Sequence, residues 1–213
     1  MNLYVEPGHP DAGAPLLGWF ARAIAAMDGE VVIASGDDNL VRSRRPDDPG
    51  ARPFVVVASG LPNLVHEFVH AIQFGRLADD HGIDYGLIPL DVTDAMQRRI
   101  LWEELACCVV SCAYAPAAVQ GAWFKEQVEI QGVFYGLEGD VAGFAALVDR
   151  TDAAHPGELA GVVAAAYAAT ERALVAAGAP APEARPGQRP EFSGLWARYR
   201  AGVPVAAPGL AGR

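Results

Sequence analysis

The stretch LPNLVHEFVHAIQF, residues 61–74, combines a regular apolar pattern with three titratable side chains. Its apolar residues recur at helical spacing, and Pro62 suits the first turn of a helix because that position needs no backbone N–H donor. Charged residues are absent from the stretch apart from one glutamate. We therefore predict a helix here that packs against a hydrophobic core.

Within this predicted helix, His66, Glu67 and His70 form the pattern His-Glu-x-x-His. Residues four apart lie about 40° apart around a helix axis and about 6 Å apart along it, so both imidazoles can reach one metal ion. Glu67 lies beside them, where it can polarise a metal-bound water without being a ligand. The pattern predicts a zinc site. The alternative is that both histidines are simply hydrogen-bonded and that Glu67 pairs with an arginine.

A catalytic zinc site needs a third protein ligand and a fourth position for water. A third histidine six residues beyond His70 is absent, because Arg76 stands there, and this excludes the metzincin pattern. Glu103 and Glu104 lie on the next predicted helix. Glu103 is one turn from Arg99 and can form a surface pair with it, whereas Glu104 points away from that arginine. We favour Glu104 as the third ligand and keep Glu103 as the alternative.

The two histidines with a downstream glutamate resemble the gluzincin zinc metallopeptidases. Glu104-Leu-Ala-Cys is similar to a motif of membrane sensor proteases of the antibiotic-resistance type. Glu103-x-x-Ala, with Pro116 closing the helix, is similar to ImmA-type small soluble proteases. The resemblance implies an α+β, zincin-like fold and zinc-dependent hydrolysis of a protein or peptide substrate, with Glu67 as general base.

One position departs from that family pattern. An Asp or Asn four residues after the ligand glutamate orients a zinc histidine in these families, and Cys107 or Cys108 stands there in this chain. Such outer partners change metal affinity or activity by roughly 10- to 100-fold. Either a carboxylate of the preceding loop, Asp79, Asp84 or Asp91, takes over this role, or the site is weakened.

Other titratable residues have weaker claims. Four of them are candidate oxyanion partners, although a surface or packing role is the preferred interpretation of each: His81, Tyr85, Tyr114 and His155. Glu126 and Glu129 could supply the third ligand instead, but a solvated face explains them better. Cys108 and Cys112 are four residues apart, as two metal ligands on one helix could be, but the preferred interpretation is that they are small side chains packed in the core. His9 receives no role.

The remaining segments predict a small mixed sheet and further helices around the 61–74 helix. Strands are expected at 3–5, 31–34 and 54–58, and helices at 15–27, 141–149 and 159–176. A long helix capped by Thr93 or Asp94 should run to about Tyr114. Residues 37–53 and 79–92 read as loops.

The composition changes after residue 178. The stretch APAPEARPGQRP cannot form a packed core and predicts a linker, so residues 1–178 form the expected zincin-like domain and residues 179–213 a linker and basic tail. The tail contains five arginines and two glutamates. Its FSGLWARYR segment either docks on the domain or stays solvated.

Composition limits the classes of partner. A net charge of −10 over 213 residues disfavours nucleic acid and anionic lipid surfaces. The first residues lack a secretory signal, and no uninterrupted apolar run approaches the roughly 20 residues that cross a bilayer, so we expect a cytoplasmic protein without a membrane partner. The three cysteines are close together and should remain reduced.

Two functions compete with a metallopeptidase acting on one dedicated substrate. The first is a catalytically inactive zincin-like protein that binds a partner. The second is a metal-dependent hydrolase of non-peptide amides, because a metal, a water and a base serve that reaction equally well.

Overall fold

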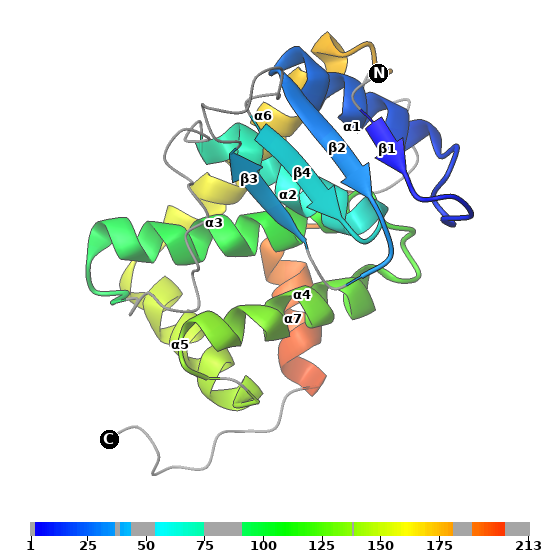
Figure 1. Ribbon diagram of the computed structural model, residues 1–213. Helices are drawn as coiled ribbons and strands as arrows, with labels where there is room; N and C mark the ends of the chain where they lie inside the picture. The colour runs from blue at the N-terminus through cyan, green and yellow to red at the C-terminus, as the bar shows by residue number, and fades with distance from the viewer. Residues whose placement is uncertain are drawn as a thin grey trace.

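A computed structural model of the chain describes residues 3–36, 39–43, 54–74, 91–137, 139–180 and 189–202 (Figure 1). Within them the protein is α+β and mostly helical, with a small sheet at one end of the molecule. The elements are β1 (Leu3–Val5), α1 (Pro15–Ala26), β2 (Gly29–Ile33), β3 (Leu40–Ser43), β4 (Phe54–Ala58), α2 (Leu61–Phe74), α3 (Ala95–Cys112), α4 (Gln120–Phe134), α5 (Val141–Ala154), α6 (Glu158–Ala176) and α7 (Phe192–Gly202).

The sheet is mixed, as the sequence predicts, and has the strand order β1-β2-β4-β3. Strands β1, β2 and β4 are parallel, and β3 runs antiparallel to β4. The helices α1 and α2 pack on one face of the sheet, behind the strands in Figure 1. Only two residues separate the end of β4 from the start of α2, so the sheet determines where that helix begins.

Strand β3 corrects the prediction of a loop over 37–53. Residues Leu40–Ser43 pair antiparallel with β4, in the register Leu40↔Val57 to Ser43↔Phe54. Four residues that include an arginine carry no visible alternation, and it is the pairing with β4 that makes them a strand. Residues 37–38 and 44–53 of the predicted loop lie outside the described part of the chain.

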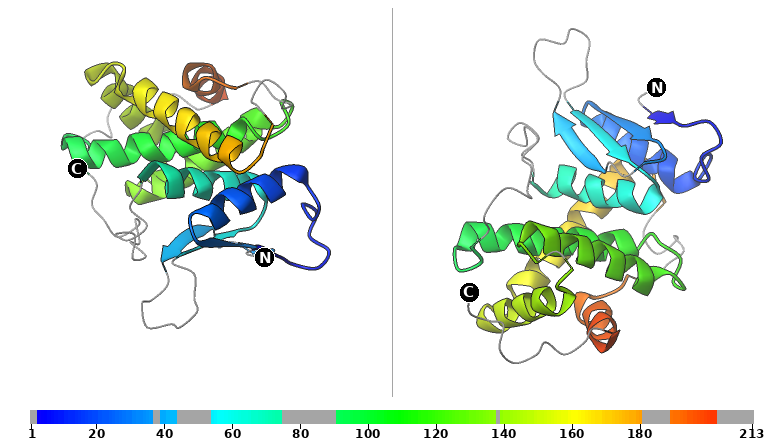
Figure 2. Two further views of the ribbon diagram at one scale, coloured as in Figure 1. Left: turned by 90° about the horizontal axis from the view of Figure 1, so that it is seen from above. Right: turned by 60° about the horizontal axis from the view of Figure 1, so that its bottom comes forward.

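Helix α3 is enclosed by α2, α4 and α6 (Figure 2). Asp94 caps it, as predicted, because its carboxylate accepts hydrogen bonds from the backbone N–H groups of Met96 and Gln97. The indole of Trp102 and the guanidinium of Arg98 both donate to Glu158 at the start of α6. These hydrogen bonds attach the first half of α3 to the start of α6.

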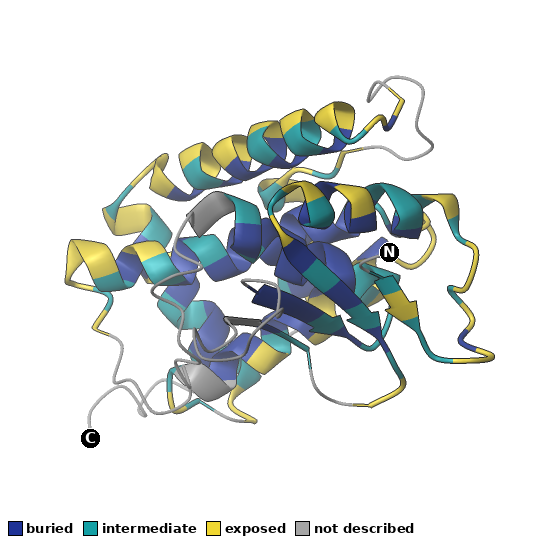
Figure 3. Ribbon diagram, turned by 45° about the horizontal axis from the view of Figure 1, so that its top comes forward, coloured by how far each residue is buried: buried dark blue, intermediate teal, exposed yellow. Residues whose placement is uncertain are grey.

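Helix α6 is long and apolar enough to cross a membrane by length and composition alone. This is weak evidence, because the core helix of a soluble protein passes the same test. One face of α6 packs on the body and the other is exposed (Figure 3). The buried residues of α6 are Leu159, Val163, Ala166, Tyr167, Thr170 and Leu174.

The segment FSGLWARYR forms α7, a helix that docks on the body. Leu195, Trp196 and Tyr199 are buried and belong to the same hydrophobic core as the rest of the chain. The Trp196 indole donates to Asp149 on α5 over 2.7 Å, and Arg200 pairs with the same carboxylate. Of the two alternatives for the tail, the structure therefore shows docking for residues 192–202.

Substituting Gly29 with Ala should destabilise the protein. A Cβ at this buried position would meet the Phe54 ring and would lie 2.6 Å from Cγ2 of Ile24. Such overpacking lowers the free energy of unfolding by about 1–3 kcal/mol, which chemical denaturation would measure. The matched control is Gly18→Ala in α1, where the nearest atom is 3.5 Å away at Arg22. An equal loss of stability in both variants would contradict the packing described for the β2–β4 pair.

Candidate metal centre

The start of α2 is held by residues far away in sequence. The backbone N–H of Leu61 donates to the Asp11 carboxylate over 2.7 Å. His9 accepts a hydrogen bond from the backbone N–H of Asp11, and its other ring nitrogen lies 3.2 Å from the Ser59 carbonyl oxygen. His9, which received no role from the sequence, is therefore a structural residue that ties the β1–α1 turn to the start of α2.

The helix α2 buries its apolar face and with it the His-Glu-x-x-His residues. Leu64, Val65, Phe68 and Val69 are fully buried. His66 and Glu67 are only 5% and 9% exposed, and His70 is half-buried. The Nε2 atoms of the two histidines lie 3.1 Å apart, as expected for side chains one helical turn apart. Helix α2 thus buries two neighbouring imidazoles and, next to the first of them in sequence, a carboxylate.

The helix α3 brings Glu104 to these histidines. The Glu104 Oε2 atom lies 3.3 Å from Nε2 of His70 and 3.6 Å from Nε2 of His66, and the residue is 7% exposed. Glu103 instead forms an i, i+4 pair with Arg99 over 2.7 Å. The helical phase that separates these two glutamates in the sequence therefore separates them in the structure.

The donor set fits a tetrahedral zinc ion. Nitrogen and oxygen ligands lie about 2.0–2.2 Å from zinc, so the edges of the tetrahedron they form are about 3.3–3.6 Å long. The three distances among His66, His70 and Glu104 are 3.1, 3.3 and 3.6 Å. Two of these distances lie within that range and the distance between the histidines is slightly shorter, so the three donor atoms are close to the spacing that ligands of one tetrahedral metal ion would have.

The charges of the cluster explain why the residues stay together. Burial alone would raise the pKa of Glu104, but the positive charges of His70 and His66 and their hydrogen bonds hold it well below its usual value. Burial would lower the pKa of His70, but Cys107 and Glu104 raise it above its usual value. A carboxylate and a cation therefore attract each other in a buried place, where a metal ion could take over the positive charge.

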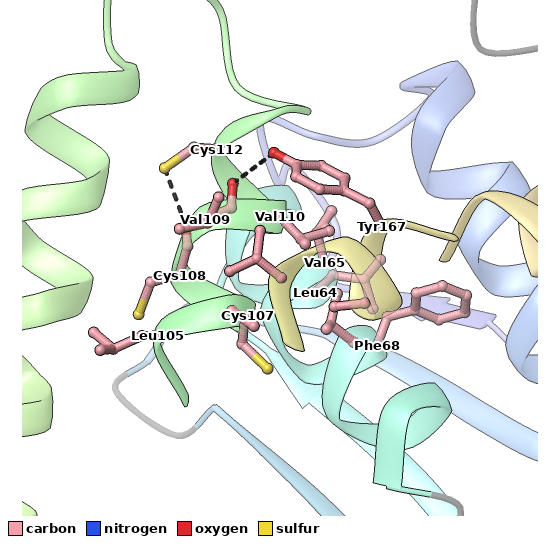
Figure 4. Close-up of a cluster of buried hydrophobic side chains, with 14 of the residues drawn as sticks. Leu64, Val65, Phe68, Leu105, Cys107, Cys108, Val109, Val110, Cys112 and Tyr167 are labelled. Atoms are coloured by element: carbon pink, nitrogen blue, oxygen red, sulfur yellow. Dashed lines mark hydrogen bonds between the residues drawn. The ribbon is translucent and has the colours of Figure 1, made fainter. Parts of the chain in front are cut away.

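Cys107 forms a second three-residue group with the same histidines. One ligand atom each of His66, His70 and Cys107 lie within 4.8 Å of one another. Burial raises the pKa of the Cys107 thiol to about 11, and His70 partly offsets that effect. The side chains of Cys107 and Cys108 leave α3 in different directions (Figure 4). The residue four after Glu104, Cys108, is thus not the one that contacts a histidine here; Cys107 is.

Other predicted residues lie elsewhere. Tyr114 donates to Glu171 on α6, and His155 lies 3.8 Å from Glu158. Asp91 is exposed and accepts hydrogen bonds from Thr93.

Glu126 is exposed and Glu129 pairs with Lys125, which fits a solvated helix face. Cys112 is buried, and its thiol donates to the Cys108 carbonyl. Four candidates lie outside the described residues: Asp79, His81, Asp84 and Tyr85.

Two buried polar residues of α4 and its end escaped the sequence analysis. The Gln131 Oε1 and Tyr135 hydroxyl oxygen atoms are buried and have no hydrogen-bond partner among the described residues, as is also true of His66 Nδ1. Burial raises the pKa of the Tyr135 hydroxyl, and the negative charge of Glu104 raises it further. The sequence predicts no helix over Gln120–Phe134, so it does not predict where these side chains lie.

Comparisons of the chain with protein-family models, with curated proteins and with solved structures found no match.

Proposed function

We propose that this protein is a zincin-like, zinc-dependent metallopeptidase. His66, His70 and Glu104 would hold the ion, and Glu67 would act as general base. One observation carries the proposal: donors from two helices converge at 3.1–3.6 Å in a buried place, with a carboxylate adjacent to the first histidine.

A zinc ion bound here supplies Lewis acidity, which polarises a carbonyl and lowers the pKa of a water molecule. Glu67 does the proton transfer: its carboxylate takes the proton of the attacking water and returns it to the leaving amine. Glu67 suits this task because it follows His66 directly and is almost fully buried. A buried carboxylate interacts more strongly with a nearby proton donor than one in water does.

The sheet favours an extended peptide as substrate. Strand β3 lies at the end of the strand order, so one of its edges is unpaired among the described strands. Helix α2, which carries the histidines, packs against both β3 and β4. An extended peptide could add to this edge and present its backbone beside α2. A dedicated protein or peptide substrate is consistent with this arrangement.

An inactive zincin-like binding protein is the second candidate. It is favoured by Cys107, whose sulfur lies within 4.8 Å of a ligand atom of each histidine and could occupy the coordination position that a catalytic centre keeps for water. In that case the ion would have a structural role and Glu67 would transfer no proton.

Metal removal tests the proposal. Protein purified without chelator or metal-affinity steps should contain about one zinc per chain by elemental analysis. It should cleave members of a peptide library in a mass-spectrometric assay, lose that activity after chelation and regain it with added zinc. A chain that binds no zinc would exclude a metallopeptidase. A chain that keeps zinc but cleaves neither peptides nor small amides would support the binding protein instead.

A further inference from the structure

Cys107 is a residue that the proposed reaction does not use, although it lies beside the proposed ligands. Its side chain is fully buried, and its sulfur belongs to the group formed with both histidines. Cys108 and Cys112 are also buried, but they belong to no such group among the described residues. The location of Cys107 therefore calls for an explanation beyond apolar packing.

Cys107 lies three residues after Glu104 on α3. Residues three apart lie on the same side of a helix, so α3 presents a carboxylate and a thiol to the same histidines. Hydrogen bonds from Arg98 and Trp102 to Glu158 attach this helix to α6. Thiolates are common zinc ligands and combine with imidazoles in structural sites.

We propose that Cys107 is a fourth protein ligand, which closes the metal centre in part of the molecules and thereby restrains the activity. The inference rests on the proposed function, because it requires an ion at His66, His70 and Glu104. As the sulfur–metal bond forms, the S–H bond breaks and its proton leaves to solvent. Four protein ligands leave no position for water, so the Cys107-bound form is inactive, and the peptide cleavage proposed for the wild type comes from the fraction of molecules in which the sulfur–metal bond is open.

Cobalt(II) substitution tests this ligation without any measurement of activity. A thiolate bound to cobalt gives an intense charge-transfer band in the near ultraviolet, whereas histidine and carboxylate ligands give only weak visible bands. The wild type should show both kinds of band. Cys107→Ala and Cys107→Ser should lose the near-ultraviolet band and keep the visible ones. Cys108→Ala is the matched control, since it removes a buried thiol from the same helix, and it should keep both.

Two outcomes would overturn the inference, and they differ in what they imply. Visible bands without a sulfur band in the wild type would remove Cys107 from the ligand set and leave the metal centre intact. Failure of the wild type to bind cobalt or zinc would remove the proposed function as well. Circular dichroism and thermal melting of each variant would identify one that does not fold, and the serine variant, which is close to cysteine in size, provides the second test of the same ligand.

Proton release provides an independent readout of the closed form. Zinc binding to the wild type should release about one proton more than zinc binding to Cys107→Ala, because only the wild type deprotonates the thiol. Titration calorimetry in buffers of different ionisation enthalpy measures this difference. Equal proton release by both proteins would contradict ligation by Cys107.

Discussion

Glu67→Gln is expected to keep its zinc and to lose about 100- to 10,000-fold in the rate of peptide cleavage. The amide is nearly the same size as the carboxylate, so the buried site should stay packed. It cannot accept a proton from water at neutral pH, so the proton transfer that the proposed mechanism assigns to Glu67 would be lost. Zinc content by elemental analysis and cleavage rates on one library-derived peptide would measure the two properties on the same sample.

The control for this prediction is a carboxylate that lies away from the site. Glu126 is exposed on α4, and Glu126→Gln should cleave the peptide at the wild-type rate. If Glu67→Gln kept full activity together with its zinc, another group would have to be the base. If it lost zinc and activity together, Glu67 would be needed to hold the centre, and the assignment of general base would fail.

The sequence alone predicts much of the candidate site because helical geometry is regular. The four-residue spacing of His66 and His70 places their side chains together whatever the rest of the fold does. The choice between Glu103 and Glu104 also follows from phase: a glutamate one turn from Arg99 has a partner on the helix surface. Its neighbour must point elsewhere, and here it points to the histidines.

The features that the sequence does not predict depend on tertiary contacts. Strand β3 exists because β4 pairs with it. The docking of the FSGLWARYR segment, which the sequence leaves open, is decided by aromatic residues of α7 that are buried in the core. The proximity of Cys107 to the histidines depends on how α3 is rotated against α2, which no local pattern shows. Cys108 is the next residue in the sequence, but its side chain leaves the helix in a different direction.

The proposed ligands Glu104 and Cys107 predict two different kinds of metal site at the same two histidines. With Glu104 as the third ligand and water as the fourth, the donor set is that of a catalytic zinc site. With Cys107 added, it is that of a closed site. Because the two residues lie three apart on one helix, the same fold presents both side chains to the histidines, and the presence or absence of the bond from Cys107 distinguishes the two states.

Glu104→Gln is expected to abolish stoichiometric zinc, whereas Glu103→Gln should retain about one zinc per chain. The neutral amide removes a negative charge that lies 3.3 and 3.6 Å from the two histidines. Loss of an outer partner costs roughly 10- to 100-fold in affinity, and loss of a direct ligand should cost more. Competition with a chromophoric chelator would give the zinc affinity of each variant.

Glu103→Gln is a close control because it changes the adjacent residue in the same way. It breaks an exposed pair with Arg99, and exposed pairs of this kind contribute about 0.3–0.5 kcal/mol. Its fold and its zinc should therefore survive. If zinc were lost in Glu103→Gln and kept in Glu104→Gln, the third ligand would be the other glutamate. If both variants kept zinc at wild-type affinity, neither carboxylate would be a ligand, and the ion would have to be held by the histidines with Cys107.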